Sequence, residues 1–175
     1  MQYLFSICPE IEQVSIDECY MDYTPISEKY TSPEVAAAYI KDSVYEKFGF
    51  TVNVGISDRK VLAKMASDFK KPNLVHTLYK REIQEKLWPL PISSLFMCGG
   101  SSVEALHKLG ITTIGELATS DIEIIKAHLK SHGQTLWEYA NGIDNSSVGA
   151  QPVKMKGIGN STTLSQDVVT KEAAY

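Results

Sequence analysis

The chain has 175 residues, of which 43% are hydrophobic and 22% are charged, with a formal net charge of -4. This size fits one domain or two small ones, and the composition is ordinary for a globular protein. No apolar run approaches the roughly 20 residues of a membrane helix, and residues 1–10 lack a signal-peptide pattern, so we expect no membrane association. Three cysteines without a CxxC pair are expected to be reduced core thiols of a cytoplasmic protein.

Residues 1–79 show the mixed pattern of an α+β fold. In chain order we expect the end of a helix over 1–8, strands over 11–16 and 19–24, a helix over 32–47, a strand over 51–57, a helix over 59–69 and a strand over 74–79. Ser32-Pro33-Glu34 supports the start of the second helix, because serine caps a helix, proline suits its first turn and an acid favours its positive end. The order predicts a mainly antiparallel sheet with helices on one face.

Residues 80–148 contain no strand pattern and predict a small all-helical domain. We expect a helix over 99–109 that ends at Gly110, and another over 136–140 that ends at Gly142. Two capping boxes, which begin at Thr113 and Ser120, mark further helix starts. The polar tail over 149–175 contains a candidate strand over 157–164.

An acidic pair, Asp17-Glu18, lies inside the sequence Ser-Ile-Asp-Glu-Cys-Tyr-Met-Asp of residues 15–22. Apolar and polar residues alternate around the pair, which is typical of a half-buried strand, and acids in mid-strand oppose β propensity. Adjacent carboxylates suit hard divalent cations, and two such cations are the usual apparatus of phosphoryl transfer. The alternative is that the pair belongs to a hairpin turn or a solvated edge.

A basic segment follows in an otherwise acidic chain. Residues 59–81 contain one acid, Asp68, against seven basic residues: Arg59, Lys60, Lys64, Lys70, Lys71, Lys80 and Arg81. Such a cluster can mark an anion-binding surface. Lys64 and Asp68 are spaced i, i+4 and can pair on one helix face. Lysines near a carboxylate-metal site could bind a triphosphate, although an ordinary solvated helix has the same composition.

Residues 97–117 resemble a helix-hairpin-helix module. A glycine-containing turn enters a helix, and Leu-Gly-Ile at 109–111 leads to a second short helix. In such modules the backbone N–H groups at the hairpin and the helix start bind a DNA phosphate without reading bases. Met97 replaces the first glycine of the usual hairpin. The residues expected to contact DNA are Gly99, Gly100, Ser101 and Ser102.

Together, the sequences SIDECYMD, VGISDRKVLAKMASDFKKPN and LHKLGITTIGELA resemble a Y-family (translesion) DNA polymerase of the DinB and UmuC/ImpB/MucB/SamB type. The resemblance implies that Asp17 ligates two catalytic Mg²⁺ ions and that Glu18 completes the site of the ion that activates the primer 3′ hydroxyl. It implies that Lys71 contacts the incoming triphosphate and that Lys64 assists together with Asp68.

The resemblance also implies a domain order and partners. Residues 1–79 would be a partial palm, 80–148 the thumb, and 149–175 the linker and start of the little finger. A strand with a third carboxylate and the fingers would lie before Met1, and most of the little finger and any sliding-clamp-binding tail after Tyr175. Primer-template DNA and deoxynucleoside triphosphates are the expected partners in the bacterial cytoplasm. Without the third carboxylate, the 175 residues are expected to be inactive alone.

Two alternatives remain open. The chain could be a non-enzymatic module that binds the DNA backbone through its helical domain. It could also be a nucleotide cyclase, which has a related palm, although the Gly-Gly-Asp-Glu-Phe signature is absent from the sequence. Binding of primer-template DNA, and its dependence on salt, distinguishes the first alternative from an isolated catalytic domain.

Overall fold

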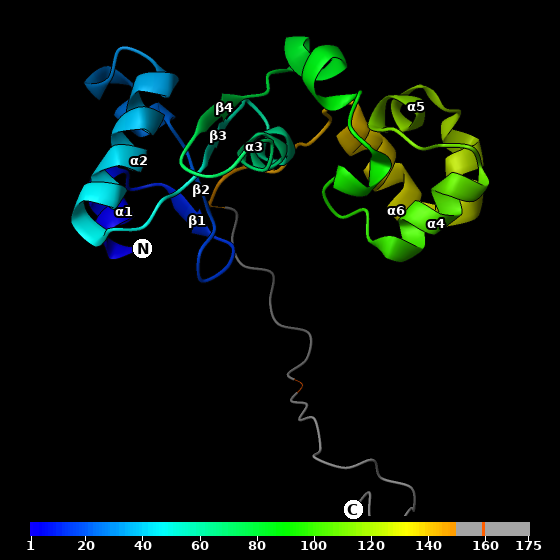
Figure 1. Cartoon of the computed structure of the whole chain (residues 1–175), viewed down its shortest axis with the longest axis horizontal. Coiled ribbons are helices and arrows are strands. Elements are labelled where there is room, and N and C mark those ends of the chain that lie inside the picture. Colours follow the sequence, from blue (N-terminus) through cyan, green and yellow to red (C-terminus); the bar gives the residue numbers. More distant parts are fainter. Residues whose placement is uncertain (150–158, 160–175) are drawn as a thin grey trace, which may run out of the picture.

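In the computed structural model, which describes residues 1–149 and Gly159, strands occur only before residue 80 among the described residues. The N-terminal part, residues 1–79, contains α1 (Gln2–Ile7), β1 (Ile11–Gln13), β2 (Cys19–Met21), a 3-10 helix (Thr24–Lys29), α2 (Pro33–Phe48), β3 (Val54–Ile56), α3 (Lys60–Ser67) and β4 (Val75–Thr77). The helical part, residues 80–148, begins with two short 3-10 helices (Lys80–Glu82 and Ile92–Ser94) and, between them, a π helix (Ile83–Leu87). Helices α4 (Gly100–Lys108), α5 (Ile114–Thr119) and α6 (Ile122–Ala140) follow (Figure 1).

The described strands form two separate pairs. β1 and β2 are antiparallel, with Ile11 opposite Met21, whereas β3 and β4 are parallel, with Val54 opposite Val75. The predicted mainly antiparallel sheet is therefore wrong for the described residues, although the α+β class is confirmed. The reason is the connection: α3 crosses over between β3 and β4, and a crossover returns the chain in the same direction.

The acidic pair lies in the turn between β1 and β2 and not within a strand, as its alternating pattern first indicated. The backbone N–H of Val14 donates to the carbonyl of Glu18 at 3.0 Å, which closes the hairpin. The predicted strands over 11–16 and 19–24 are each shortened to three paired residues. The expected strands over 51–57 and 74–79 are shortened in the same way.

The boundaries of α2 agree with the sequence prediction. The Ser32 side chain accepts a hydrogen bond from the N–H of Val35, and Gly49 ends the helix with a φ of 75°. A positive φ is a conformation that glycine adopts at little cost, which explains the stop at this position. The predicted helix over 59–69 is also confirmed, as α3.

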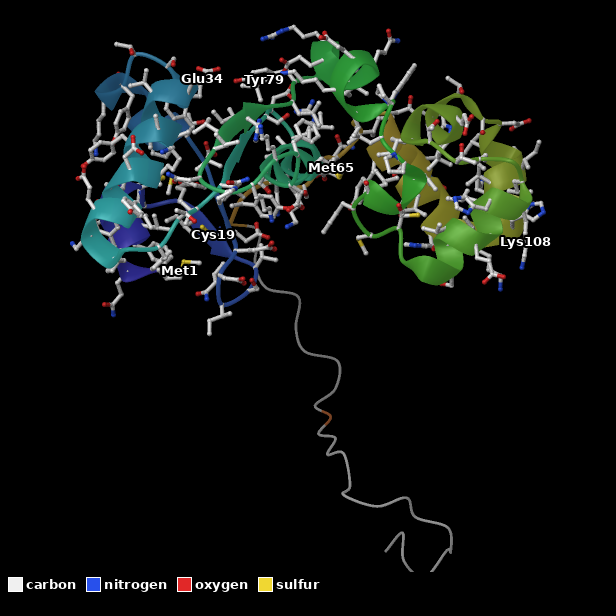
Figure 2. The ribbon with its side chains drawn as sticks, viewed as in Figure 1. Met1, Cys19, Glu34, Met65, Tyr79 and Lys108 are labelled. Carbon is white, nitrogen blue, oxygen red and sulfur yellow. The ribbon has the colours of Figure 1, made fainter. Side chains whose placement is uncertain are left out.

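Helix α3 packs on the strands and joins the two parts of the molecule. Its buried residues are Val61, Leu62, Met65 and Ala66, and they share one apolar core with residues of the helical part. Figure 1 shows α3 between the β3–β4 pair and the helical part, and Figure 2 labels Met65 at this boundary. The two parts are therefore expected to stabilise each other.

Gly55 permits the close approach of α3 to β3. A Cβ atom at this position would lie 1.9 Å from the carbonyl oxygen of Ala63 and 2.5 Å from the backbone nitrogen of Ser67. Both are backbone atoms of α3, which cannot move aside as a side chain can. Position 55 must therefore be glycine for the helix to pack at this distance.

The helical part has one of its two predicted capping boxes. At the start of α5, the Thr113 side chain accepts from the N–H of Glu116, whose carboxylate accepts from the N–H of Thr113. The second box, predicted from Ser120, is not formed, because Asp121 caps α6 instead and accepts from the N–H of Glu123. Helix α6 is also far longer than the predicted 136–140 helix and is kinked at Lys130.

None of the described helices combines the length and apolar character that a membrane span needs. All three cysteines lie within the described residues and form no disulfide, and Cys8 and Cys98 are buried. Cys19 is only partly buried, so two of the three expected core thiols lie in the interior. Apart from Gly159, the candidate strand over 157–164 lies outside the described residues.

Candidate functional site

Ser15 orders the turn that carries the acidic pair. Its hydroxyl donates to Oδ1 of Asp17 at 2.7 Å and accepts from the backbone N–H of Glu18 at 3.1 Å. The hydrogen bond from Ser15 lowers the pKa of Asp17 below its ordinary value, and the positive charges of Lys64 and Lys71 act in the same direction. Asp17 is therefore ionised at neutral pH and held by its neighbour.

The acidic pair lies beside the basic face of α3. Nζ of Lys64 lies 2.5 Å from Oε1 of Glu18 and 3.3 Å from Oδ2 of Asp68. Nζ of Lys71 lies 2.8 Å from Oδ1 of the same Asp68. Glu18, Lys64, Asp68 and Lys71 thus form a row of alternating charges, which we call the charge row. The structure brings together the two acids and both lysines that the sequence singled out.

The charge row shifts the pKa values of its central residues. Burial lowers the pKa of Lys64, but hydrogen bonds to Glu18 and Asp68 outweigh burial and raise it above its ordinary value. Burial raises the pKa of Asp68, but hydrogen bonds from Lys71 and Lys64 outweigh burial and lower it. Both groups are consequently charged at neutral pH.

Asp17, Glu18, Lys64 and Lys71 line one open hollow between the β1–β2 turn, α3 and the adjoining strands. The two carboxylates are exposed, and their oxygen atoms are the ligands that Mg²⁺ prefers. In the part of the chain that the structure describes, no three His, Cys, Asp or Glu side chains converge as a metal site. The acidic pair alone therefore offers two carboxylate side chains to a divalent cation, fewer ligands than a complete site has.

The hairpin at the start of α4 retains a glycine-like backbone. Met97 has a φ of 65°, which is in the left-handed region that glycine adopts most readily. Gly99, Gly100 and Ser101 are exposed. Ser102 is only 5% exposed, so its side chain is buried.

Sequence reasoning missed a polar cluster that joins three distant segments. Nζ of Lys60 lies 2.8 and 2.7 Å from the two carboxylate oxygens of Glu12, and the N–H of Gly149 donates to Glu12 at 3.2 Å. Asp144 accepts from the N–H of Val61 at 2.9 Å. We call these residues the return junction, because here the chain after α6 meets β1 and α3 again. No local sequence signal could have revealed it, since its members are far apart in the chain.

Comparison with known families and proteins identifies relatives of the whole chain. Residues 1–68 match the impB/mucB/samB family. The chain is 51% identical over 175 residues to DNA polymerase IV of Clostridium acetobutylicum, and the match covers 100% of this chain and 44% of that protein. It is 43% identical over 173 residues to DNA polymerase IV of Alkaliphilus oremlandii, covering 98% of this chain and 44% of that protein.

Solved structures show the same relationship. A Y-family DNA polymerase chimera of Dbh and Dpo4 matches with a TM-score of 0.74 and 29% identity, covering 85% of this chain and 44% of that chain. The insertion ternary complex of Dbh DNA polymerase gives the same four values. The chain therefore spans less than half the length of the proteins it matches, and the resemblance to Y-family polymerases predicted from sequence is confirmed.

Proposed function

Because this chain is related over its full length to DNA polymerase IV proteins and shares its fold with Y-family DNA polymerases, we propose that it is part of a DNA-directed DNA polymerase that extends primers past damaged template bases. Residues 1–79 would form part of the palm, 80–148 the thumb, and 149–175 the linker and start of the little finger. The observation that carries the proposal is the acidic pair beside Lys64 of α3 and beside Lys71, which follows that helix.

In this proposal the acidic pair holds the catalytic metal ions. Asp17 would ligate both Mg²⁺ ions, and Glu18 would complete the site of the ion near the primer 3′ hydroxyl. When bound, the ions supply charge stabilisation for the attacking and leaving oxygens. Ser15 supports this role, because its hydrogen bond keeps Asp17 ionised and oriented.

The lysines of the charge row would bind the incoming deoxynucleoside triphosphate. Lys71 is 60% exposed, and its partner Asp68 is also at the surface, so its ammonium group can exchange Asp68 for a phosphate oxygen. Lys64 is less exposed, at 18%, and lies between Glu18 and Asp68. It would add positive charge close to the metal ligands. A lysine suits this purpose because it acts as a point charge and needs no fixed geometry.

The helical part would hold primer-template DNA by its backbone. Gly99, Gly100 and Ser101 expose the start of α4, where backbone N–H groups and the helix dipole favour a phosphate. Ser102 would contribute through the position of the turn, since its side chain is buried. In this proposal the protein also has a sliding clamp as a partner, and it acts in the bacterial cytoplasm.

A chimera tests the proposed activity. These 175 residues would replace the matching region of the Clostridium acetobutylicum relative, and the purified chimera would be assayed for Mg²⁺-dependent primer extension. We expect extension by the chimera and loss of extension after Asp17→Asn. A chimera that folds and binds primer-template DNA but extends no primer would contradict the proposal.

The 175-residue chain alone is expected not to polymerise. Its described residues bring only two carboxylates together, and Mg²⁺ requires near-ideal octahedral coordination. Primer extension with all four nucleotides checks this, and robust synthesis by the chain alone would overturn it.

A second candidate function is a DNA-backbone-binding module without catalysis, which the exposed start of α4 favours. Fluorescence anisotropy with primer-template DNA at several salt concentrations separates the candidates. A phosphate-driven contact weakens steeply as salt rises. Binding by a chimera that never extends a primer would favour the module.

A further inference from the structure

We propose that Lys64 is a built-in counter-ion of Glu18, and that a divalent cation must displace its ammonium group before the acidic pair can close around that cation. The inference rests on the proposed function, since it concerns the same two carboxylates. It adds a regulatory role for a lysine that the proposal otherwise assigns to the triphosphate.

The contact between Lys64 and Glu18 is the first observation. Nζ of Lys64 lies 2.5 Å from Oε1 of Glu18, so a positive charge already occupies the side of the carboxylate that faces α3. The Lys64 side chain is 18% exposed, whereas that of Glu18 is 47% exposed. The lysine is therefore the better fixed partner, and Glu18 is the partner that water and ions reach.

The two acids of the pair differ in their partners. Asp17 accepts a hydrogen bond from Ser15, and the described residues place no lysine or arginine nitrogen within ion-pair distance of it. Glu18, in contrast, is paired. An arriving cation can thus bind Asp17 without breaking an ion pair, and Glu18 joins only when it releases Lys64. The geometry points to an order, with Asp17 first and Glu18 second.

Asp68 gives the displaced lysine a place to go. It lies 3.3 Å from Nζ of Lys64, so the ammonium group can stay paired when it leaves Glu18. Asp68 also accepts from Lys71 at 2.8 Å. The movement therefore needs only a shift along the charge row, and the lysine does not enter bulk water.

Mn²⁺ binding to the purified 175-residue chain, measured by electron paramagnetic resonance, tests the inference. Removing the competing ammonium with Lys64→Met should tighten Mn²⁺ binding about fivefold, the size expected for the loss of one partly exposed ion pair. Lys60→Met is the matched control, because it removes the same charge from the same hollow but from a lysine that pairs with Glu12. We expect it to change the affinity by less than about twofold.

The rate of chemical acetylation of Lys64 provides a second measurement. A general change in charge would not alter this rate at Lys64 alone. With Mg²⁺ present, the acetylation rate of Lys64 in the wild-type chain, read by mass spectrometry, should rise. The rate at Lys60, which pairs with Glu12, should stay constant. Circular dichroism would check that each variant folds.

The outcomes separate the inference from the proposed function. Equal Mn²⁺ affinities for wild type, Lys64→Met and Lys60→Met overturn the inference and leave the metal site intact. An equal gain from both lysine variants also overturns it, because the effect would then be general. Binding that survives Asp17→Asn combined with Glu18→Gln, or a complete absence of binding in every variant, overturns the assigned metal site and the inference with it.

Discussion

The carboxylate of Asp144 accepts a hydrogen bond of 2.9 Å from the backbone N–H of Val61, which lies 83 positions earlier in the chain. Val61 is in the first turn of α3, and that helix has no side-chain cap from its own N-cap residue, Arg59. Asp144 therefore caps α3 from a distant segment. Its negative charge also suits the positive end of the helix dipole.

Replacing Asp144 by alanine should lower the free energy of unfolding by about 1 kcal/mol, which is the usual cost of losing a helix cap. Urea unfolding followed by circular dichroism measures the loss. Asn145→Ala is the control, because this exposed neighbour makes no hydrogen bond within the described residues. Equal stability of both variants would contradict the capping role.

The contribution of Asp144 should depend on pH. Burial raises its pKa, but hydrogen bonds from Ser146 and Val61 and the charge of Lys60 outweigh burial and hold the pKa below its ordinary value. A carboxylate with a lowered pKa stabilises the fold above the pKa of the unfolded chain, about 4, and loses this effect as the pH falls through the folded-state pKa. The stability difference between wild type and Asp144→Asn should thus shrink as the pH falls below about 4. A difference that grows in acid would refute the assignment.

Leu62→Ala should destabilise both parts of the molecule together. Leu62 is fully buried in the core that joins α3 to the helical part, and such truncations cost about 2–5 kcal/mol. Circular dichroism reports the whole chain, whereas Trp88 and Trp137 both report the helical part. Unfolding followed by the two probes should give transitions that coincide, and both should show a lower stability than in the wild type. Ile124→Ala, at a position 52% exposed, serves as the control and should change little.

Gly55→Ala should push α3 away from β3 and so destabilise the chain. The added Cβ would meet backbone atoms of the helix, so the expected cost is about 3 kcal/mol, at the upper end for overpacking. Gly100→Ala provides the comparison, because no atom lies within 4 Å of a Cβ there. Thermal unfolding should give a lower midpoint for the first variant alone.

Met97→Gly should stabilise the chain by about 1 kcal/mol. The φ of 65° at Met97 is strained for any residue with a Cβ atom, and glycine removes this strain. Met97→Ala is the matched control, because it shortens the side chain and keeps the Cβ. If the hairpin binds a DNA phosphate, the glycine variant should also bind primer-template DNA at least as tightly. A gain in stability from alanine equal to that from glycine would show that the side chain, and not the backbone, is responsible.

The sequence was most informative where a local rule decides the structure. Ser32 and Gly49 bound α2, and the Thr113 box starts α5, because side chains a few residues away satisfy the helix ends. It was least informative where partners are distant. The parallel pairing of β3 with β4 follows from the α3 crossover, which no alternation of residues encodes.

The candidate site was predicted in its residues but not in its contacts. Residue type indicates Asp17 and Glu18, the i, i+4 spacing to Asp68 indicates Lys64, and the family resemblance indicates Lys71; the structure places all four in one hollow. The pairing of Lys64 with Glu18 spans 46 positions and depends on how the hairpin folds over α3. The return junction was missed for the same reason, since Glu12 is unremarkable until Lys60 and Gly149 come beside it.

The return junction has a mechanical consequence. The helical part is connected to the N-terminal part where the chain leaves β4, and again where Asp144 and Gly149 bind α3 and β1. Because α3 also shares its apolar core with the helical part, a swing of the helical part must break both these hydrogen bonds and the core contacts of α3. The helical part is therefore expected to keep its place relative to α3 and β1, so that it moves with them as one body.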